Sequence, residues 1–387
     1  MEAYFDNAAT TKVAPEVAEI MMKVMREDYG NPSSKHMKGV EAEEYIDKSR
    51  KTIAELLKCE PKNIIFTSGG TEANNQALIS TALAYERSGK HIITTKFEHA
   101  SVHEPLLFLE SRGFEISFID VDEDGQVDAD ELKNMIREDT ILISMMYVNN
   151  EVGAVLDIES LVKAAKSVND RIIFHVDAIQ GFGKYRIYPK RLGIDLMSVS
   201  GHKFHGPKGS GFLYRSEKLK EAAYIFGGGQ EKNLRSGTEN VPAIAGIGVA
   251  AELMYKKLDE KLEKMYAVKQ ALIDGISELD EAVFNINRSL DAKVGAPHVL
   301  SVSFDGVKSE VLLHALEADG IYVSSGSACS SNHPQLSGTL KAIGVKEKLL
   351  DSTIRFSLSS ENTVEQAQYA AEVLKKHVPI LKKFKRY

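Results

Sequence analysis

Side chains that could bind a ring carrying a phosphate group follow several predicted β-strands of this chain. The stretch Thr67–Ala73 places two glycines between a strand and a helix, where backbone amides can hold one phosphate. Asp177 ends another predicted strand, so its carboxylate would face a ligand crevice, unless it caps the next helix instead. Lys203 follows Ser-Gly-His at a further strand end, and His99 either follows a strand toward the same edge or lies in a surface loop.

Together these groups match what pyridoxal 5'-phosphate (PLP) requires of a protein. Lys203 can form a Schiff base with the aldehyde, and Asp177 can keep the pyridine nitrogen protonated so that the ring accepts electrons. The amides that follow Thr67 can hold the phosphate, and His99 can stack on the ring. We therefore expect PLP as the cofactor.

Two other motifs point to ligands that their context contradicts. Asp120–Glu131 fits a calcium-loop pattern, but a strand-like stretch precedes it, and a turn followed by a helix capped by Asp128 explains it better. Gly201–Ser210 resembles a nucleotide phosphate loop, yet Pro207 stands where that loop needs lysine. His99 and His103 have metal-ligand spacing without a third ligand, so we expect no metal site.

Short β-branched runs alternate with helical stretches through the first two thirds of the chain, which predicts an α/β fold with a mostly parallel, seven-stranded sheet. The predicted strands are 64–67, 91–95, 114–119, 140–145, 171–176, 196–199 and 211–214. A long helix over 243–279 would lead to a smaller α+β domain with strands at 299–304 and 353–357 and helices at 309–318 and 364–383. We expect a large domain over 15–255 and a small domain formed by 1–14 and 256–387.

Composition and charge narrow the function classes further. The 387 residues contain 48 basic and 55 acidic side chains, and this net charge of −7 argues against a nucleic-acid or anionic-membrane partner. Neither a signal peptide nor an apolar membrane segment is visible, so we expect a cytoplasmic protein. The only cysteines are Cys59 and Cys329, too few for a disulfide scaffold.

The motifs, taken in order, closely resemble those of the cysteine desulfurases of the NifS/IscS type, which are class-V aminotransferases with the fold-type-I PLP architecture. The resemblance spans nearly the whole chain and rests on Tyr4–Thr11, Gly30–Ser34 with His36, Thr67–Glu72, Glu98–His99, Val148–Glu151, His175–Ala178 with Gln180, Ser200–Lys203, Arg235–Thr238, Ser324–Cys329 and Ile354–Ser357. One departure is Ser359–Glu361, where the family often has Gly-Arg, and the stretch after Cys329 also differs.

The resemblance implies a role for each matching residue. Lys203 would be the Schiff-base lysine, Asp177 the partner of the pyridine nitrogen and Gln180 that of the ring hydroxyl, while His99 would stack on the ring and move protons. The phosphate would be held by Gly70, Thr71, Ser200 and His202, with Thr238 contributed by the other subunit of a homodimer. The substrate carboxylate would be bound by Asn150 and Arg355, the arginine through a bidentate pair.

Cys329 is the residue that decides the reaction. Small and polar neighbours at about 324–337 favour a mobile loop around it, whereas Cys59 sits on a helical pattern typical of packing. The resemblance implies removal of sulfur from L-cysteine, giving L-alanine and a persulfide on Cys329 that passes to an acceptor protein for iron–sulfur cluster assembly or tRNA thiolation. Two alternatives stay open: a selenocysteine lyase or small-amino-acid aminotransferase of the same fold, and a sulfur-transfer scaffold with low turnover.

Overall fold

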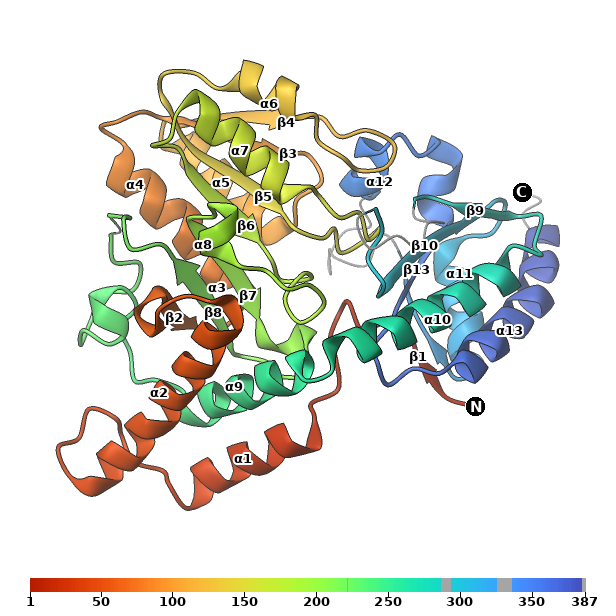
Figure 1. The fold of residues 1–387 in the computed structure, drawn as a ribbon. Coiled ribbons are helices and arrows are strands. Elements are labelled where there is room, and N and C mark those ends of the chain that lie inside the picture. Colours follow the sequence, from red (N-terminus) through yellow and green to blue (C-terminus); the bar gives the residue numbers. More distant parts are fainter. Residues whose placement is uncertain (221, 287–293, 326–335, 385–387) are drawn as a thin grey trace.

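A seven-stranded sheet forms the centre of the larger part of the molecule in the computed structural model, which describes residues 1–220, 222–286, 294–325 and 336–384 (Figure 1). Its strand order is β2 (Ile64–Thr67), β8 (Gly211–Arg215), β7 (Leu196–Ser200), β6 (Ile173–Asp177), β5 (Thr140–Met146), β3 (His91–Thr95) and β4 (Glu115–Ile119). All neighbours pair in parallel except β8, which is antiparallel to both β2 and β7. The predicted α/β class and the mostly parallel sheet are confirmed.

The strands alternate their side chains between two hydrophobic clusters, so both faces of the sheet are covered. Ile92 and Ile173 pack in one cluster, with helical residues between Ala73 and Leu109, whereas Ile93 and Phe174 pack in the other. The helices of this part are α1 (Pro15–Arg26), α2 (Met37–Leu57), α3 (Gly70–Asn75), α4 (Thr81–Tyr85), α5 (Ala100–Ser111), α6 (Ala129–Met135), α7 (Ile158–Val168), α8 (Pro189–Leu192) and α9 (Val241–Tyr255). Figure 1 shows α1, α2 and α9 grouped together, and both α1 and α2 contact α9.

A second, antiparallel sheet has its own hydrophobic cluster. Its order is β12 (Ser324–Ser325), β13 (Thr353–Ser357), β10 (Val299–Phe304) and β9 (Ala282–Phe284). Beside it, β1 (Ala3–Tyr4) pairs in parallel with β11 (Ile321–Tyr322), which brings the start of the chain to this smaller part. The helices here are α10 (Leu258–Ile276), α11 (Ser309–Ala318) and α13 (Val364–Lys383), and the start of the chain lies on this side in Figure 1. The short helix α12 (Gly338–Ala342) instead contributes Leu340 to the main hydrophobic cluster.

Two details correct the expectations from sequence. The single helix predicted over 243–279 is two helices, because the backbone turns extended at Lys256 and left-handed at Lys257, with a φ of 57°. This break lets α9 pack against α1 and α2 while α10 packs against α13. Cys59 is not within a helix, since α2 ends at Leu57, but it is half-buried against the main hydrophobic cluster as a packing residue would be.

The acidic stretch that imitates a calcium loop has the predicted alternative structure. It begins after β4 rather than after a helix, and Gly125 turns with a φ of 71°. Asp128 caps α6 by accepting hydrogen bonds from the backbone N–H groups of Asp130 and Glu131. Within the described ranges, no helix is both long enough and apolar enough to span a membrane.

Candidate active site

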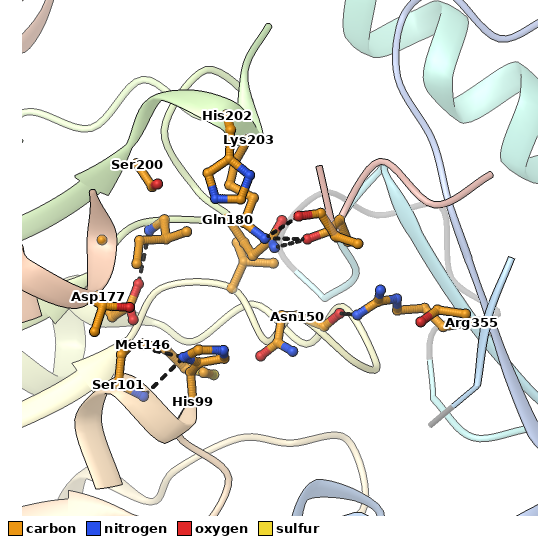
Figure 2. Close-up of a pocket in the computed structure, with 17 residues that line it drawn as sticks. His99, Ser101, Met146, Asn150, Asp177, Gln180, Ser200, His202, Lys203 and Arg355 are labelled. Carbon is orange, nitrogen blue, oxygen red and sulfur yellow. Dashed lines mark hydrogen bonds between the residues drawn. The ribbon is translucent and has the colours of Figure 1, made fainter. Parts of the chain in front are cut away.

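A cavity of about 340 Å³ lies at the carboxyl ends of the central strands. Asp177 is the last residue of β6, Ser200 ends β7 and Met146 ends β5, while Ala8 and Ala9 close the cavity from the N-terminal segment. Ten of the residues predicted from sequence line it: Gly70, Thr71, His99, Asn150, Asp177, Gln180, Ser200, His202, Lys203 and Arg355. In Figure 2, Asp177 and Arg355 lie on opposite sides, with Lys203 and His99 between them.

Asp177 is a buried carboxylate held by two N–H donors. Its Oδ1 accepts from the backbone N–H of Ile179 at 2.9 Å, and its Oδ2 accepts from Nδ2 of Asn74 at 2.8 Å. Burial raises the pKa of Asp177, while these donors and the nearby His99 and Lys203 act in the opposite direction. A cation facing this carboxylate would therefore stabilise its ionised form.

Lys203 projects its amine toward the N-terminal segment. It ends the single helical turn that follows β7, and its Nζ donates to the carbonyl oxygens of Ala8 at 2.7 Å and Ala9 at 2.8 Å (Figure 2). Gln180 donates from Nε2 to the same Ala8 carbonyl at 3.0 Å. The N-terminal segment thus fixes both a primary amine and a primary amide at the cavity wall.

His99 is the N-cap of α5 and uses its ring for the cap. Its Nδ1 accepts from the backbone N–H of Ser101 at 3.1 Å and lies 2.9 Å from the hydroxyl of the same serine. Burial lowers the pKa of His99, and Lys203 lowers it further, against the opposing charge of Asp177. The ring is therefore neutral near pH 7, with its Nε2 on the edge opposite the cap.

The stretch after β2 approaches the neighbouring strands very closely. Gly69 has a φ of 152°, and a Cβ on Gly70 would lie 2.2 Å from Cδ1 of Ile179, so a larger residue at position 70 would have to displace the Ile179 side chain. The hydroxyls of Thr71 and Ser200 line the same side of the cavity. His202 joins them, with a pKa lowered to about 4 by burial and by Lys203.

Arg355 reaches the opposite side of the cavity from β13 of the second sheet. Its Nη1 donates to the carbonyl oxygen of Asn150 at 2.9 Å, and its Nη2 pairs with the Asp6 carboxylate at 2.9 Å. The Nε of Arg355 is buried and has no hydrogen-bond partner among the described residues. Because each terminal nitrogen carries two N–H groups, the guanidinium keeps further donors for a carboxylate entering the cavity.

Two predicted residues remain to be accounted for, Cys329 and Thr238. Cys329 lies in 326–335, outside the described residues, and the neighbouring Ser324 of β12 lines the cavity. Beyond this stretch, Ser337 caps α12 and donates to Oε2 of Glu151 at 2.5 Å. Thr238 is exposed and does not line the cavity.

Several functional neighbours escaped sequence reasoning. Asn74, Ser101 and Glu98 surround Asp177 and His99; Glu98 belongs to the motif Glu98–His99 without having been assigned a role, and Ser101 lies two residues after His99. Burial and the charge of Asp177 raise the pKa of Glu98 to about 8. Lys184, whose Nζ donates to the Lys203 carbonyl at 2.7 Å, is buried, which lowers its pKa to about 7. Membership of a motif, or a place close to one, was the only signal for Glu98, Ser101 and Asn74, and no signal marked Lys184.

Comparisons with known proteins agree on one family. The model of the aminotransferase class-V family matches residues 3–369. The chain is 42% identical over 386 residues to the cysteine desulfurase IscS of Dictyoglomus turgidum, covering 100% of this chain and 97% of that protein. It is 44% identical over 370 residues to the putative cysteine desulfurase IscS 1 of Bacillus subtilis, covering 95% and 96%.

Solved structures give the same result in three dimensions. A NifS-like protein superposes with a TM-score of 0.92 at 37% identity, covering 98% of this chain and 100% of that one. The structure of SspA in complex with cysteine has a TM-score of 0.80 at 34% identity, covering 92% and 99%. The match extends over both sheets in each case.

Proposed function

The chain belongs to the aminotransferase class-V family and is a PLP-dependent cysteine desulfurase of the IscS/NifS type, and from this premise we propose which of its residues carry the reaction. We propose that PLP lies between Asp177 and Lys203 and that Cys329 receives the sulfur of L-cysteine. The observation that supports this most directly is the convergence of Asp177, Lys203 and Arg355 on one cavity from two different sheets.

The residues present fit the cofactor. Asp177 offers a buried carboxylate whose ionised form needs a cation, which a protonated pyridine nitrogen supplies. Gly70, Thr71, Ser200 and His202 offer a helix start and polar side chains for the phosphate, and Gln180 offers an amide for the ring hydroxyl. The neutral His99 ring can stack on the pyridine without adding charge.

When bound, PLP withdraws electrons from the Cα of the amino acid and returns them to carbon as the Cβ–S bond breaks. Lys203 is the residue that we assign to the covalent attachment of PLP and to carrying the proton removed from Cα. Its two carbonyl contacts, to Ala8 and Ala9, orient the amine toward the cavity. His99, with a proton on Nε2, is the second proton carrier of the site.

L-cysteine would be oriented by its carboxylate. Arg355 uses one N–H of Nη1 for the Asn150 carbonyl and one N–H of Nη2 for Asp6, and the second N–H of each nitrogen would bind the carboxylate. Charge-assisted pairs of this kind are short and directional, so they fix Cα relative to Lys203.

The sulfur step requires one thiolate. The Cys329 sulfur attacks the sulfur of L-cysteine, the new S–S bond forms as the Cβ–S bond breaks, and the bonding electrons leave with Cβ, which is then protonated to give L-alanine. Described residues on both sides of Cys329 lie beside the substrate-binding residues, which supports this role. Ser324 pairs with Arg355 across β12 and β13, and Ser337 binds Glu151, the residue after Asn150. Cys59 is unsuited, because burial raises its pKa to about 12.

We further propose a homodimer in which the exposed Thr238 completes the phosphate site of the other subunit. The persulfide would pass to an acceptor protein of iron–sulfur cluster assembly or tRNA thiolation. The division into domains at 15–255 and at 1–14 with 256–387, and the cytoplasmic location, stay predictions.

Mass spectrometry after incubation with L-cysteine tests the sulfur step. We expect a sulfur-mass adduct on the Cys329 peptide of the holoenzyme, lost on treatment with a thiol reductant and absent from the Cys329→Ala variant. The Cys59→Ala variant is the matched control and should retain the adduct. Undiminished alanine production by the Cys329→Ala variant would contradict the assignment.

A spectroscopic experiment tests the cofactor residue separately. The Lys203→Ala variant should lose the visible absorbance of covalently attached PLP, because no other amine in the described cavity lining replaces Lys203. If the absorbance persisted unchanged, Lys203 would not be the attachment site.

A further inference from the structure

Asn74 connects the two residues assigned to the ring of PLP although it does not line the cavity itself. Its side chain is fully buried, and its Nδ2 donates both to Oδ2 of Asp177 at 2.8 Å and to Oγ of Ser101 at 2.9 Å. Ser101 in turn lies 2.9 Å from Nδ1 of His99 (Figure 2). A continuous chain of hydrogen bonds therefore runs from Asp177 through Asn74 and Ser101 to His99.

With Asp177 ionised, the direction of each of these hydrogen bonds follows from its partners. The amide of Asn74 must present Nδ2 to Asp177, because the flipped amide would bring two acceptor oxygens together. Nδ1 of His99 accepts from the backbone N–H of Ser101, so it carries no proton. The Ser101 hydroxyl, already accepting from Asn74, therefore donates its own hydrogen to Nδ1.

We propose that Asn74 and Ser101 are positioning residues that link the ionised carboxylate of Asp177 to the Nε2-protonated tautomer of His99. This inference rests on the proposed function, since it assigns a purpose to holding these two groups together at one cofactor. Asn74 acts only through its neighbours, and Ser101, although it lines the cavity, is assigned the same positioning role; neither is expected to take part in proton transfer. The tautomer matters because it puts the ring proton on the edge opposite α5.

Several charged groups surround these hydrogen bonds and influence the charge of His99. Asp177 faces Glu98, Lys203 and His99, and His99 also faces His103. Of these groups, Lys203 and His103 oppose a charge on His99, while Asp177 favours it. Removing a donor to Nδ1 withdraws one stabilising contact of the neutral ring without changing any of these charges.

Nitrogen NMR of cofactor-free, histidine-labelled protein tests the proposal without any turnover, with His99→Gln identifying the resonance. The parent protein should show His99 with its proton on Nε2. The Ser101→Ala variant should raise the pKa of His99 by about half to one pH unit, the equivalent of one hydrogen bond. Ser101→Thr, which keeps the hydroxyl, should restore the parent value.

A double-mutant cycle then distinguishes coupling of Asn74 to His99 through the Ser101 hydroxyl from simple packing effects. Asn74→Leu should shift the Nδ1 resonance of His99, and the shift should shrink by at least half in the Ser101→Ala background. Effects that pass through the charge of Asp177 are equal in both backgrounds and cancel. If Asn74→Leu does not fold, the smaller Asn74→Ala serves; equal shifts in both backgrounds would overturn the proposal.

Kinetics of the loaded enzyme give the second measurement. Ser101→Ala should lower kcat for L-cysteine by about two- to tenfold with KM nearly unchanged, because the substrate carboxylate is bound elsewhere. Ser80→Ala is the matched control, since Ser80 is also buried and its hydroxyl has no partner among the described residues. It should change neither His99 nor kcat. The NMR result can fail while Lys203→Ala still loses PLP, so the two proposals are tested apart.

Discussion

The two sides of the cavity hold their key charges in different ways. Asp177 stands at the end of a central strand, and its described donors, from Ile179 and Asn74, belong to the same sheet-centred part of the molecule. Arg355 arrives from the second sheet, and its partners Asp6 and Asn150 come from two further segments. One side is therefore built within one hydrophobic unit, whereas the other is assembled between segments up to 349 residues apart.

The difference has a chemical meaning. On the Asp177 side, the N–H groups of Ile179 and Asn74 already hold the carboxylate. A cofactor that supplies a cation therefore meets a carboxylate that is oriented in advance. On the Arg355 side, Asn150 and Asp6 each occupy one N–H of a terminal nitrogen, and the second N–H of each nitrogen is left for a ligand. A permanently bound group suits the first side, and a substrate that enters and leaves suits the second.

Asp177→Asn should break the first side and cause the largest loss. Truncating one member of a buried charge pair costs about 2–5 kcal/mol, so alanine formation should fall by about 30- to 4000-fold. The new amide would also oppose one of the two donors held by Asn74 and Ile179. Steady-state kinetics measure the effect, and unfolding by heat serves as the control for stability. A loss below about threefold would contradict the pairing with a pyridine nitrogen.

Arg355→Gln should break the second side, and its effect should be seen mainly in KM. Loss of a charge-assisted contact to the substrate carboxylate should raise KM for L-cysteine by about 10- to 100-fold. PLP absorbance should stay unchanged, because Arg355 is assigned to substrate alone. A variant that lost PLP while keeping KM would reverse the roles of the two sides.

The same contrast explains what sequence could and could not predict. Asp177 and Lys203 follow strands, and strand ends of a parallel sheet meet at one edge, so local patterns were enough to bring them together. The pairing of Arg355 with Asp6 depends on the N-terminal segment lying along β13, where Asp6 bridges Ser357, and no local pattern encodes this contact. Asn74 and Ser101 likewise meet because α3 packs against α5. The helix break at Lys257 was missed because neither glycine nor proline marks it.

The Glu98→Gln variant tests the Asp177 side through the pH dependence of folding stability. The pKa of Glu98 is raised from the ordinary 4.5 to about 8 by burial and by Asp177, so the folded protein binds a proton there that the unfolded chain releases. Its contribution to stability is therefore full below pH 4.5 and is lost as pH rises toward 8. Glutamine mimics the protonated acid at every pH.

Relative to the parent protein, the Glu98→Gln variant should gain at least about 1 kcal/mol of stability between pH 5 and pH 8. Thermal unfolding of both proteins across this range measures the difference, in which titrating groups that do not interact with Glu98 cancel. The Oε1 contacts to Met146 and Thr95 remain possible with glutamine. Parallel pH curves would mean that Glu98 is ionised beside Asp177.

Asp6→Asn should give the smallest effect. It tests whether Arg355 needs the negative charge of Asp6 to keep its position. Asparagine keeps an acceptor oxygen for Nη2 of Arg355 but removes a negative charge that opposes an incoming carboxylate. KM for L-cysteine should therefore fall by about two- to fivefold, the size of a modest charge interaction. A rise in KM instead would show that the Asp6 charge is needed to hold Arg355 in place, and that this side is oriented in advance like the Asp177 side.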